Sequence, residues 1–417
     1  MLDMLIRTLE KGELSHQVLQ QVYADPGLSS RDLAFINRLY SGTLEKLVYL
    51  DHVIGSFSSI PVRKMKPAIR NILRMSLYQM KFMDAVPVPV SIDEGVKLAR
   101  KKGFSGLTGF VNGILRRADR EAGQLSLPPY VKACAPEWIY DLITNQYGKE
   151  DAEAFFRAVQ KTEEGTRIRL CLSGSTKEGI ITSLQEDGCV VTPLEGLEDC
   201  CSISGFDRLT SLRAFQNGEI LIQDPSSVMA ARTAVEQMPD PELVVDVCAA
   251  PGGKSLYVAE KCPGARVIAR DLTSQKTERI MENARRLKIR NVEAQVYDAR
   301  VPDPELKERA DVVICDLPCS GLGVISRKPD ILYRLKKQDL KDLALLQREI
   351  LDAARMYVKP GGVLVYSTCT VNRQENEENA KWFVGNFGGE FSMISERQYL
   401  PGRDPFDGFY VAAFRKG

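Results

Sequence analysis

The 417-residue sequence has very few histidines, no long apolar run and almost no net charge. Its two histidines, His16 and His52, lie far upstream of every motif described below, so we expect neither a histidine base nor a histidine-bound metal. No segment reaches the roughly 18 consecutive apolar residues that a membrane helix needs. The amino-terminal stretch carries charges where a signal peptide would have its apolar segment. We therefore expect a cytoplasmic protein that does not bind membranes.

The sequence also lacks the cysteine patterns of disulfide-rich and zinc-binding proteins. Its ten cysteines are irregularly spaced and form no paired Cys-x-x-Cys motifs, which predicts reduced thiols and no metal site. With 44% hydrophobic and 27% charged residues, the composition excludes wholesale disorder. A chain of this length is expected to form two or three globular domains.

The net charge of +1 conceals an asymmetry along the chain. Residues 1–124 contain 18 Lys and Arg against 12 Asp and Glu, so they are basic, whereas the remainder is slightly acidic. The excess is concentrated in three clusters at 63–74, 97–102 and 116–120. Any single cluster is more often a solvated helix face, but three clusters in one domain favour contact with nucleic acid.

Hydrophobic periodicity and turn-rich segments divide the chain into three predicted domains. Residues 1–124 show helical spacing, for example at Ile69, Ile72, Leu73 and Leu77, and end in the linker-like AGQLSLPPY (122–130). Residues 125–214 are expected to form a small α+β domain. In residues 215–417 apolar strands alternate with amphipathic helices, which predicts a doubly wound, Rossmann-like α/β fold. The expected strands are 243–249, 265–271, 292–298, 311–318, 362–369 and 409–414.

A glycine-rich loop follows the first of these strands. LVVDVCAAPGGKSLYVAE (243–260) leads through a Gly-Gly turn into a helix, a geometry that presents backbone N–H groups to a ligand. A phosphate-binding P-loop would need glycine at Cys248, and a dinucleotide fingerprint would need a third glycine. The loop instead resembles that of class I S-adenosylmethionine methyltransferases. Asp271 ends the second strand and suits ribose hydroxyls, while Asp298 ends the third and suits an adenine amino group.

Two cysteines follow the next two strands, in DLPCSGLG (316–323) and YSTCT (366–370), at the same edge of the sheet. Most free cysteines are small buried hydrophobes, but polar, turn-forming neighbours favour a functional interpretation of Cys319 and Cys369. Carbon 5 of cytosine becomes nucleophilic only after a thiolate adds to carbon 6. Asp316 is placed to protonate or hydrogen-bond ring nitrogen 3, and a second cysteine suits removal of the carbon-5 proton.

These motifs identify a family resemblance. VDVCAAPGGKS (245–255), DLPCSGLGV (316–324), RKPDI (327–331), and PGGVLVYSTCT followed by NxxEN (360–376) resemble the motifs of RNA cytosine-5 methyltransferases. The whole chain is similar to the RsmB (Sun/Fmu) branch, which modifies 16S ribosomal RNA. Residues 86–117 resemble the NusB-type helical RNA-binding domain of that branch.

The resemblance implies roles for individual residues. Cys369 is implied as the nucleophile and Cys319 as the residue that assists product release. It also implies that Asp407 and Gly408, in FDGFYVAAFRK (406–416), shape the base pocket. The implied cofactor is S-adenosylmethionine. Its implied ligands are Cys248, Ala249, Ala250, Pro251, Gly252, Gly253, Lys254, Asp271, Asp298 and Asp316.

The expected protein is thus a monomeric enzyme that methylates carbon 5 of a cytosine in small-subunit ribosomal RNA and does not act on DNA. One alternative is a cytosine-5 methyltransferase that acts on transfer RNA, and the NusB-like segment argues against it. Another is a non-catalytic RNA-binding factor with a degenerate methyltransferase domain. The presence of both Cys319 and Cys369 argues against that alternative.

Overall fold

The computed structural model describes residues 1–161, 165–194 and 196–417, which form two compact units. Unit 1 comprises Met1–Lys161 together with Ile325–Leu335, and unit 2 comprises Thr162–Val324 and Lys336–Gly417. The predicted division into three domains, with 125–214 as a separate domain, stays a prediction. Among the described residues, no helix combines the length and apolarity needed to cross a bilayer.

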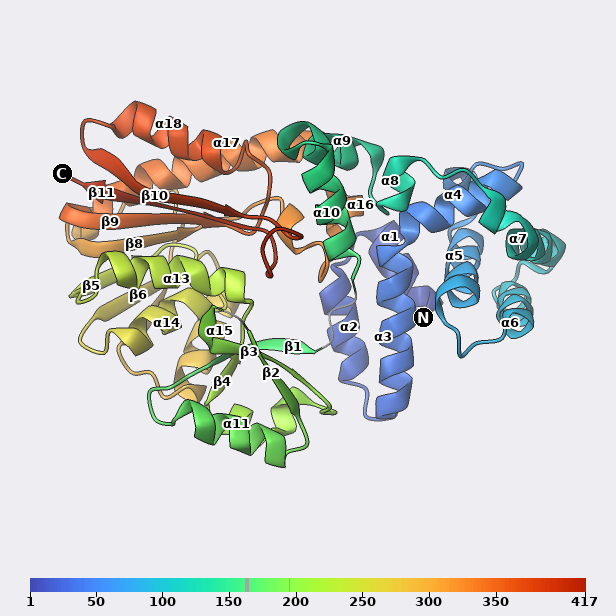
Figure 1. The fold of residues 1–417 in the computed structure, drawn as a ribbon, viewed down its shortest axis with the longest axis horizontal. Coiled ribbons are helices and arrows are strands. Elements are labelled where there is room, and N and C mark those ends of the chain that lie inside the picture. Colours follow the sequence, from blue (N-terminus) through green and yellow to red (C-terminus); the bar gives the residue numbers. More distant parts are fainter. Residues whose placement is uncertain (162–164, 195) are drawn as a thin grey trace. The chain divides into compact units, whose positions relative to one another are not determined.

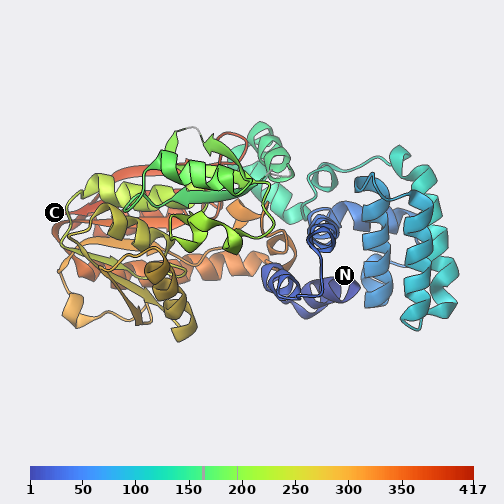
Figure 2. The same ribbon diagram turned by 90° about the horizontal axis from the view of Figure 1, so that it is seen from below.

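The described elements of unit 1 are all helical, as Figures 1 and 2 show. Its helices are α1 (Leu2–Lys11), α2 (Ser15–Tyr23), α3 (Ser30–Glu45), α4 (Leu47–Phe57), α5 (Pro67–Phe82), α6 (Val88–Lys101), α7 (Thr108–Glu121), α8 (Pro129–Lys132), α9 (Glu137–Tyr147), α10 (Lys149–Val159) and α16 (Ile331–Arg334). The helical periodicity predicted around Ile69 and Leu77 is confirmed, because both residues are buried on α5. Proline in the first turn of α5 and α6 suits a helix start, where no backbone donor is lost.

The segment 325–335 belongs to unit 1 although it follows the DLPCSGLGV motif of unit 2. Asp330, which is 2% exposed, accepts hydrogen bonds from the backbone N–H and the side-chain hydroxyl of Ser15, the first residue of α2. Its carboxylate therefore caps the positive end of that helix. The Tyr333 hydroxyl donates to the Leu44 carbonyl at 2.7 Å. A segment more than 160 residues away in sequence thus completes the helical unit.

Unit 2 contains a small antiparallel sheet and a large mixed sheet. The small sheet has the strand order β2-β3-β1-β4. Its elements are β1 (Thr166–Leu170), β2 (Val190–Leu194), β3 (Leu197–Ser204) and β4 (Ile220–Ile222), with α11 (Lys177–Glu186) and α12 (Arg213–Gln216). Arg169 on β1 is fully buried and pairs with Glu260, so its charge is compensated inside the unit.

The large sheet has the strand order β10-β11-β9-β8-β5-β6-β7, with β9, β8, β5, β6 and β7 parallel. Its strands are β5 (Leu243–Asp246), β6 (Arg266–Asp271), β7 (Val292–Val296), β8 (Ala310–Asp316), β9 (Val358–Thr368), β10 (Phe391–Tyr399) and β11 (Phe409–Lys416). All six predicted strands are present, and the Rossmann-like prediction is confirmed. The seventh strand, β10, was not predicted.

Helices cover both faces of the large sheet in Figure 1, where α17 and α18 lie on one face and α13 and α14 on the other. These helices are α13 (Pro225–Gln237), α14 (Gly253–Lys261), α15 (Ser274–Arg286), α17 (Lys337–Ala354) and α18 (Glu377–Phe387). Two layers of helices leave the carboxyl ends of the parallel strands as the accessible edge, where ligands bind in folds of this kind.

Candidate active site

A cavity of about 560 Å³ lies at the carboxyl edge of the parallel strands in unit 2. It brings together residues from the loops that follow β5, β6, β7, β8 and β9. The predicted site residues that line it are Cys248, Ala250, Asp271, Asp298, Asp316, Cys319 and Cys369. The other five, Ala249, Pro251, Gly252, Gly253 and Lys254, belong to the same glycine-rich loop and the first turn of α14. The cavity is the candidate active site.

The glycine-rich loop needs glycine at its tight turn for a conformational reason. Gly252 has a φ of 104°, in the left-handed region, and a Cβ there would lie 3.1 Å from Leu256. The Ala250 N–H donates to Asp271 Oδ2 at 2.9 Å, and the Ala249 N–H donates to the Arg270 carbonyl at 2.8 Å. The loop is therefore fixed against the end of β6, next to the start of α14.

The two aspartates at the ends of β6 and β7 are held differently. Asp271 is 5% exposed and accepts from Lys276 Nζ at 2.8 Å and from the Leu272 N–H at 2.7 Å. Asp298 is more exposed, and hydrogen bonds from Arg300 hold the pKa of its carboxyl below the ordinary value. The buried aspartate is thus rigidly placed, as a ligand for ribose hydroxyls should be, whereas Asp298 is restrained mainly by one surface arginine.

Asp316 forms an ion pair with Lys254, with 2.7 Å between Oδ2 and Nζ. Its other carboxylate oxygen accepts from the Ser367 hydroxyl at 2.8 Å. Lys254 also donates to the Ser227 hydroxyl. These contacts fix Asp316 between the glycine-rich loop and the end of β9, so it lies between that loop and the two cysteines.

Asp246, at the end of β5, was not singled out in the sequence. It is 1% exposed and accepts from the Ser255 hydroxyl at 2.6 Å. Burial raises the pKa of Asp246 to about 7. Its hydrogen bond ties the strand end to the first turn of α14, which stabilises the loop between them.

The two cysteine thiols of the cavity face each other. Cys319 Sγ lies 3.3 Å from Cys369 Sγ, and both residues are half-buried. The hydrogen bond between the thiols, together with burial, raises the pKa of Cys319 well above its ordinary value. The Cys319 thiol is therefore mostly protonated at neutral pH.

The side chains of Glu375 and Gln347 hold the backbone on the two sides of Cys319. Glu375, fully buried, accepts from the Ser320 N–H at 2.8 Å and from the Ser320 hydroxyl at 2.5 Å. The Gln347 amide nitrogen donates both to Glu375 and to the Pro318 carbonyl. Because Pro318 and Ser320 are the two neighbours of Cys319, this arrangement fixes the backbone on each side of the thiol. We call Glu375 and Gln347 the cysteine clamp.

Direct hydrogen bonds also connect the two cysteine loops to each other. Ser320 and Thr370, the residues that follow the two cysteines, join their hydroxyls at 2.7 Å. The Gly323 N–H donates to the Cys369 carbonyl, and the Gly408 N–H donates to the Gly323 carbonyl. A Cβ on Gly323 would lie 2.0 Å from the Gly408 carbonyl oxygen, so only glycine fits there. The sequence placed Glu375 within NxxEN but gave no sign of its role.

Comparisons with known proteins match both units of the chain. The model of the family described as 16S rRNA methyltransferase RsmB/F matches residues 234–415, which include the glycine-rich loop and both cysteines. The NusB family model matches residues 1–120, most of the helical unit. The NusB-like helical region expected from residues 86–117 is thereby confirmed.

Two curated relatives match almost from end to end. The probable ribosomal RNA small subunit methyltransferase B of Bacillus subtilis is 34% identical over 100% of this chain and 97% of its own. The ribosomal RNA small subunit methyltransferase B of Vibrio cholerae is 30% identical over 94% of this chain and 92% of its own.

Two solved structures share the fold. The crystal structure of PH0851 superposes with a TM-score of 0.82 at 25% identity, over 99% of this chain and 98% of that protein. NSun6 from Pyrococcus horikoshii, solved with SFG, has a TM-score of 0.59 at 22% identity, over 67% of this chain and 98% of that protein.

Proposed function

Because the chain belongs to the RsmB family of S-adenosylmethionine-dependent ribosomal RNA small subunit methyltransferases, we propose that it methylates carbon 5 of a cytosine in 16S ribosomal RNA. The observation that carries this proposal is the pair of thiols 3.3 Å apart in the cavity that also holds Asp271 and Asp316. Covalent activation of a pyrimidine ring requires a nucleophile that adds to the ring and a base that accepts a proton, and two adjacent thiols can supply both.

The residues at the strand ends fit S-adenosylmethionine. The Gly252 turn leaves the backbone open at the N-terminus of α14, and Asp271 presents a buried carboxylate beside it. When bound, the cofactor supplies an electrophilic methyl group. We propose that the loop from Cys248 to Lys254 holds its amino-acid part, Asp271 its ribose and Asp298 its adenine amino group.

The proposed reaction begins with Cys369. Its thiolate adds to carbon 6 of cytosine, forming an S–C bond, and the ring electrons move towards carbon 5 and nitrogen 3. We propose that Asp316 takes a proton from the Lys254 ammonium group with which it is paired and, as a carboxylic acid, donates a hydrogen bond to nitrogen 3. Carbon 5 is then nucleophilic enough to accept the methyl group.

Cys319 completes the cycle. Methylated carbon 5 still carries its original proton, which must leave before the Cys369 S–C bond can break. Cys319 first releases its own proton to solvent, and the resulting thiolate takes the carbon-5 proton. The carbon 5–carbon 6 double bond then re-forms, and Cys369 leaves as a thiolate. The raised pKa of Cys319 supports this role, because a thiolate of high pKa is a strong proton acceptor.

Methyl transfer from labelled S-adenosylmethionine to unmodified 16S ribosomal RNA tests the proposal, with the product nucleoside identified by mass spectrometry. We expect 5-methylcytidine from the wild type, no product and no adduct from Cys369→Ala, and an accumulated protein–RNA adduct from Cys319→Ala. Cys262→Ala, a buried cysteine outside the cavity, is the matched control.

Other outcomes would correct specific parts of the proposal. An adduct in Cys369→Ala but not in Cys319→Ala would exchange the roles of the two thiols. Methylation of transfer RNA alone would reassign the substrate. Binding of RNA without any methyl transfer by the wild type would support a non-catalytic RNA-binding factor.

A further inference from the structure

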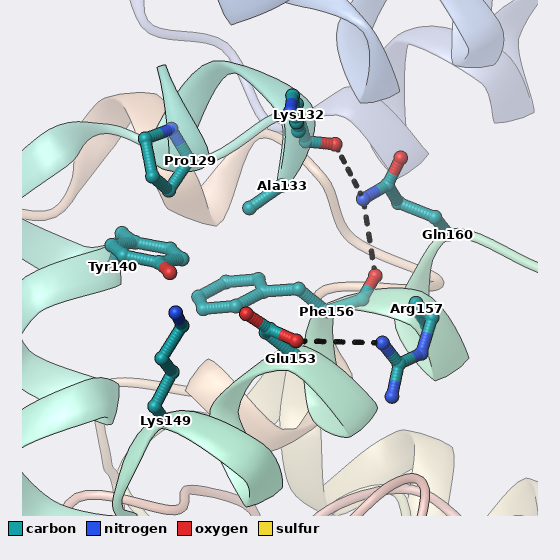
Figure 3. Close-up of a pocket in the computed structure, with 9 residues that line it drawn as sticks. All are labelled: Pro129, Lys132, Ala133, Tyr140, Lys149, Glu153, Phe156, Arg157 and Gln160. Atoms are coloured by element: carbon teal, nitrogen blue, oxygen red, sulfur yellow. Dashed lines mark hydrogen bonds and ion pairs between the residues drawn. The ribbon is translucent and has the colours of Figure 1, made fainter. Parts of the chain in front are cut away.

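A cavity of about 400 Å³ lies in unit 1, away from every motif of the sequence (Figure 3). Residues of α8, α9 and α10, together with Gln160, line it. Its volume lies within the roughly 300–1,000 Å³ range of small-molecule sites in proteins. The cavity is therefore large enough for one nucleotide. The chemistry of its lining residues determines which ligand it can bind.

An aromatic stack forms the apolar wall of this cavity. The rings of Tyr140 and Phe156 lie nearly parallel, at 24°, with 5.5 Å between their centroids. Phe156 is buried, whereas Tyr140 remains half-buried, so part of the tyrosine ring is accessible to a ligand. The Gln160 amide donates to the carbonyls of Lys132 and Phe156, which joins α8 to α10. The wall is consequently in place before anything binds.

Cations surround the aromatic wall. Lys132 and Lys149 are exposed and lie on opposite sides of the cavity in Figure 3, where the Lys149 ammonium group points towards the rings. Within the described part of the chain, no acidic side chain pairs with either lysine. The acidic residue of the lining, Glu153, forms an ion pair with Arg157 at 3.7 Å. The lining thus favours an anion that also has a planar apolar surface.

We propose that this cavity binds one unpaired nucleotide of the RNA substrate. The base stacks against Tyr140, and Lys132 and Lys149 contact its flanking phosphates. Glu153 still has free lone pairs beside its bond to Arg157, and they accept a hydrogen bond from an exocyclic amino group. RNA as the ligand rests on the proposed function, but this site lies outside the catalytic unit and needs no cofactor.

The carboxylate of Glu153 makes the site selective among bases. Adenine, cytosine and guanine each carry an exocyclic amino donor, whereas uracil has none and would place a carbonyl oxygen opposite the carboxylate. The site should therefore prefer any of these three bases to uracil. Adenine is the better probe, since cytosine is also the proposed substrate of the catalytic cavity.

The test measures binding of the full-length protein to labelled rA10 and rU10 by fluorescence anisotropy over a range of salt concentrations. Loss of stacking should weaken rA10 binding about tenfold in Tyr140→Ala, while Tyr140→Phe retains it. Lys149→Ala should lower the dependence of log affinity on log salt by about 0.7, the value of one phosphate contact in a single strand. Lys341→Ala, an exposed lysine on α17, is the matched control and should match the wild type.

Glu153→Gln should reduce the preference for rA10 over rU10, because the glutamine amide nitrogen can donate to the uracil carbonyl oxygen that a carboxylate repels. Wild-type affinity in both Tyr140→Ala and Lys149→Ala would overturn the site, and so would an equal loss in Lys341→Ala. Equal wild-type affinity for rA10 and rU10 would overturn the assigned base contact. These assays involve no methyl transfer, so a chain that binds rA10 through Tyr140 but methylates nothing would refute only the proposed catalytic function.

Discussion

The cavities of unit 2 and unit 1 differ in how their polar side chains are held. Beside the thiols, Glu375 is fully buried and accepts from Ser320, Asn372 and Gln347. Around the aromatic stack, Lys132 and Lys149 are exposed. Covalent chemistry requires groups whose positions are fixed before the reaction, whereas reversible binding of a flexible strand tolerates mobile cations. The first cavity has the order that catalysis needs, and the second the adaptability that binding needs.

The largest effect is expected from Glu375→Gln, which tests whether the fixed polar groups of unit 2 matter for catalysis. The substitution keeps the shape of the side chain but replaces one acceptor oxygen with a donor. The two hydrogen bonds from Ser320 and the one from Gln347 can no longer all form. We expect kcat for methyl transfer to fall about 100-fold, since small misplacement of reacting groups has effects of that order. S-adenosylmethionine affinity, measured by calorimetry, should remain at the wild-type value.

Glu378→Gln provides the control, because this glutamate lies three residues after Glu375, in the first turn of α18, and is exposed. It should retain wild-type kcat. If Glu375→Gln kept full kcat as well, the cysteine clamp would have no part in positioning Cys319.

A second, smaller effect distinguishes the two aspartates of the catalytic cavity. Asp271→Asn should weaken S-adenosylmethionine binding about tenfold, because a buried carboxylate that accepts from a ligand contributes more than an exposed one. Asp298→Asn should change the affinity less, since Asp298 is partly exposed and already paired with Arg300. Calorimetry measures the S-adenosylmethionine affinity of both variants. A larger loss of affinity in Asp298→Asn would show that Asp298 contributes more to binding than Asp271.

The pH dependence of turnover tests whether Cys319 acts as the base of the thiol pair. The pKa of Cys319 is raised, so its thiolate is scarce at neutral pH and becomes more abundant as pH increases. If removal of the carbon-5 proton limits turnover, kcat should rise with pH by up to about tenfold per unit while Cys319 remains mostly protonated. Quenched-flow measurement of adduct decay from pH 6.5 to 8.5 checks this. A decay rate independent of pH would remove Cys319 as the base.

The smallest effect is expected from the crossover segment of unit 1. Asp330→Asn removes the charge that caps α2 but keeps one acceptor, so stability should fall by about 1 kcal/mol. For a unit of this size, the midpoint of thermal unfolding should decrease by about 2–4 °C. Scanning calorimetry measures the shift. Asp339→Asn, at the exposed start of α17, is a control whose effect should appear in the transition of unit 2 instead.

The sequence predicted the large sheet well, because buried parallel strands are continuous apolar runs. Its missed strand, β10, reads SMISERQ between Phe391 and Tyr399, and most of these side chains are exposed. Such an edge strand follows neither the apolar run of a buried strand nor a regular alternation. It forms because β11 offers a complete antiparallel partner, and pairing of this kind is not visible in local sequence.

Seven of the twelve site residues predicted from the sequence line the cavity of unit 2, because strand ends meet at one edge of a parallel sheet. It did not predict the clamp, since the acceptor Glu375 and the donor Gln347 lie on different loops and helices and meet only after folding. Nothing in the local sequence predicted that RKPDI (327–331) belongs to unit 1. Asp330 and Ser15 are 315 positions apart, and no periodicity connects them.

That long-range contact has a consequence for the order of events during synthesis. The amino-terminal helices leave the ribosome first, but α2 lacks its cap until residue 330 has been made. By then the first four strands of the large sheet, β5 to β8, have also been made, whereas β9 and Cys369 have not. The helical unit can therefore complete its folding only when most of the enzyme has been translated. A separately expressed fragment 1–161 should be less stable than the same residues in the whole chain.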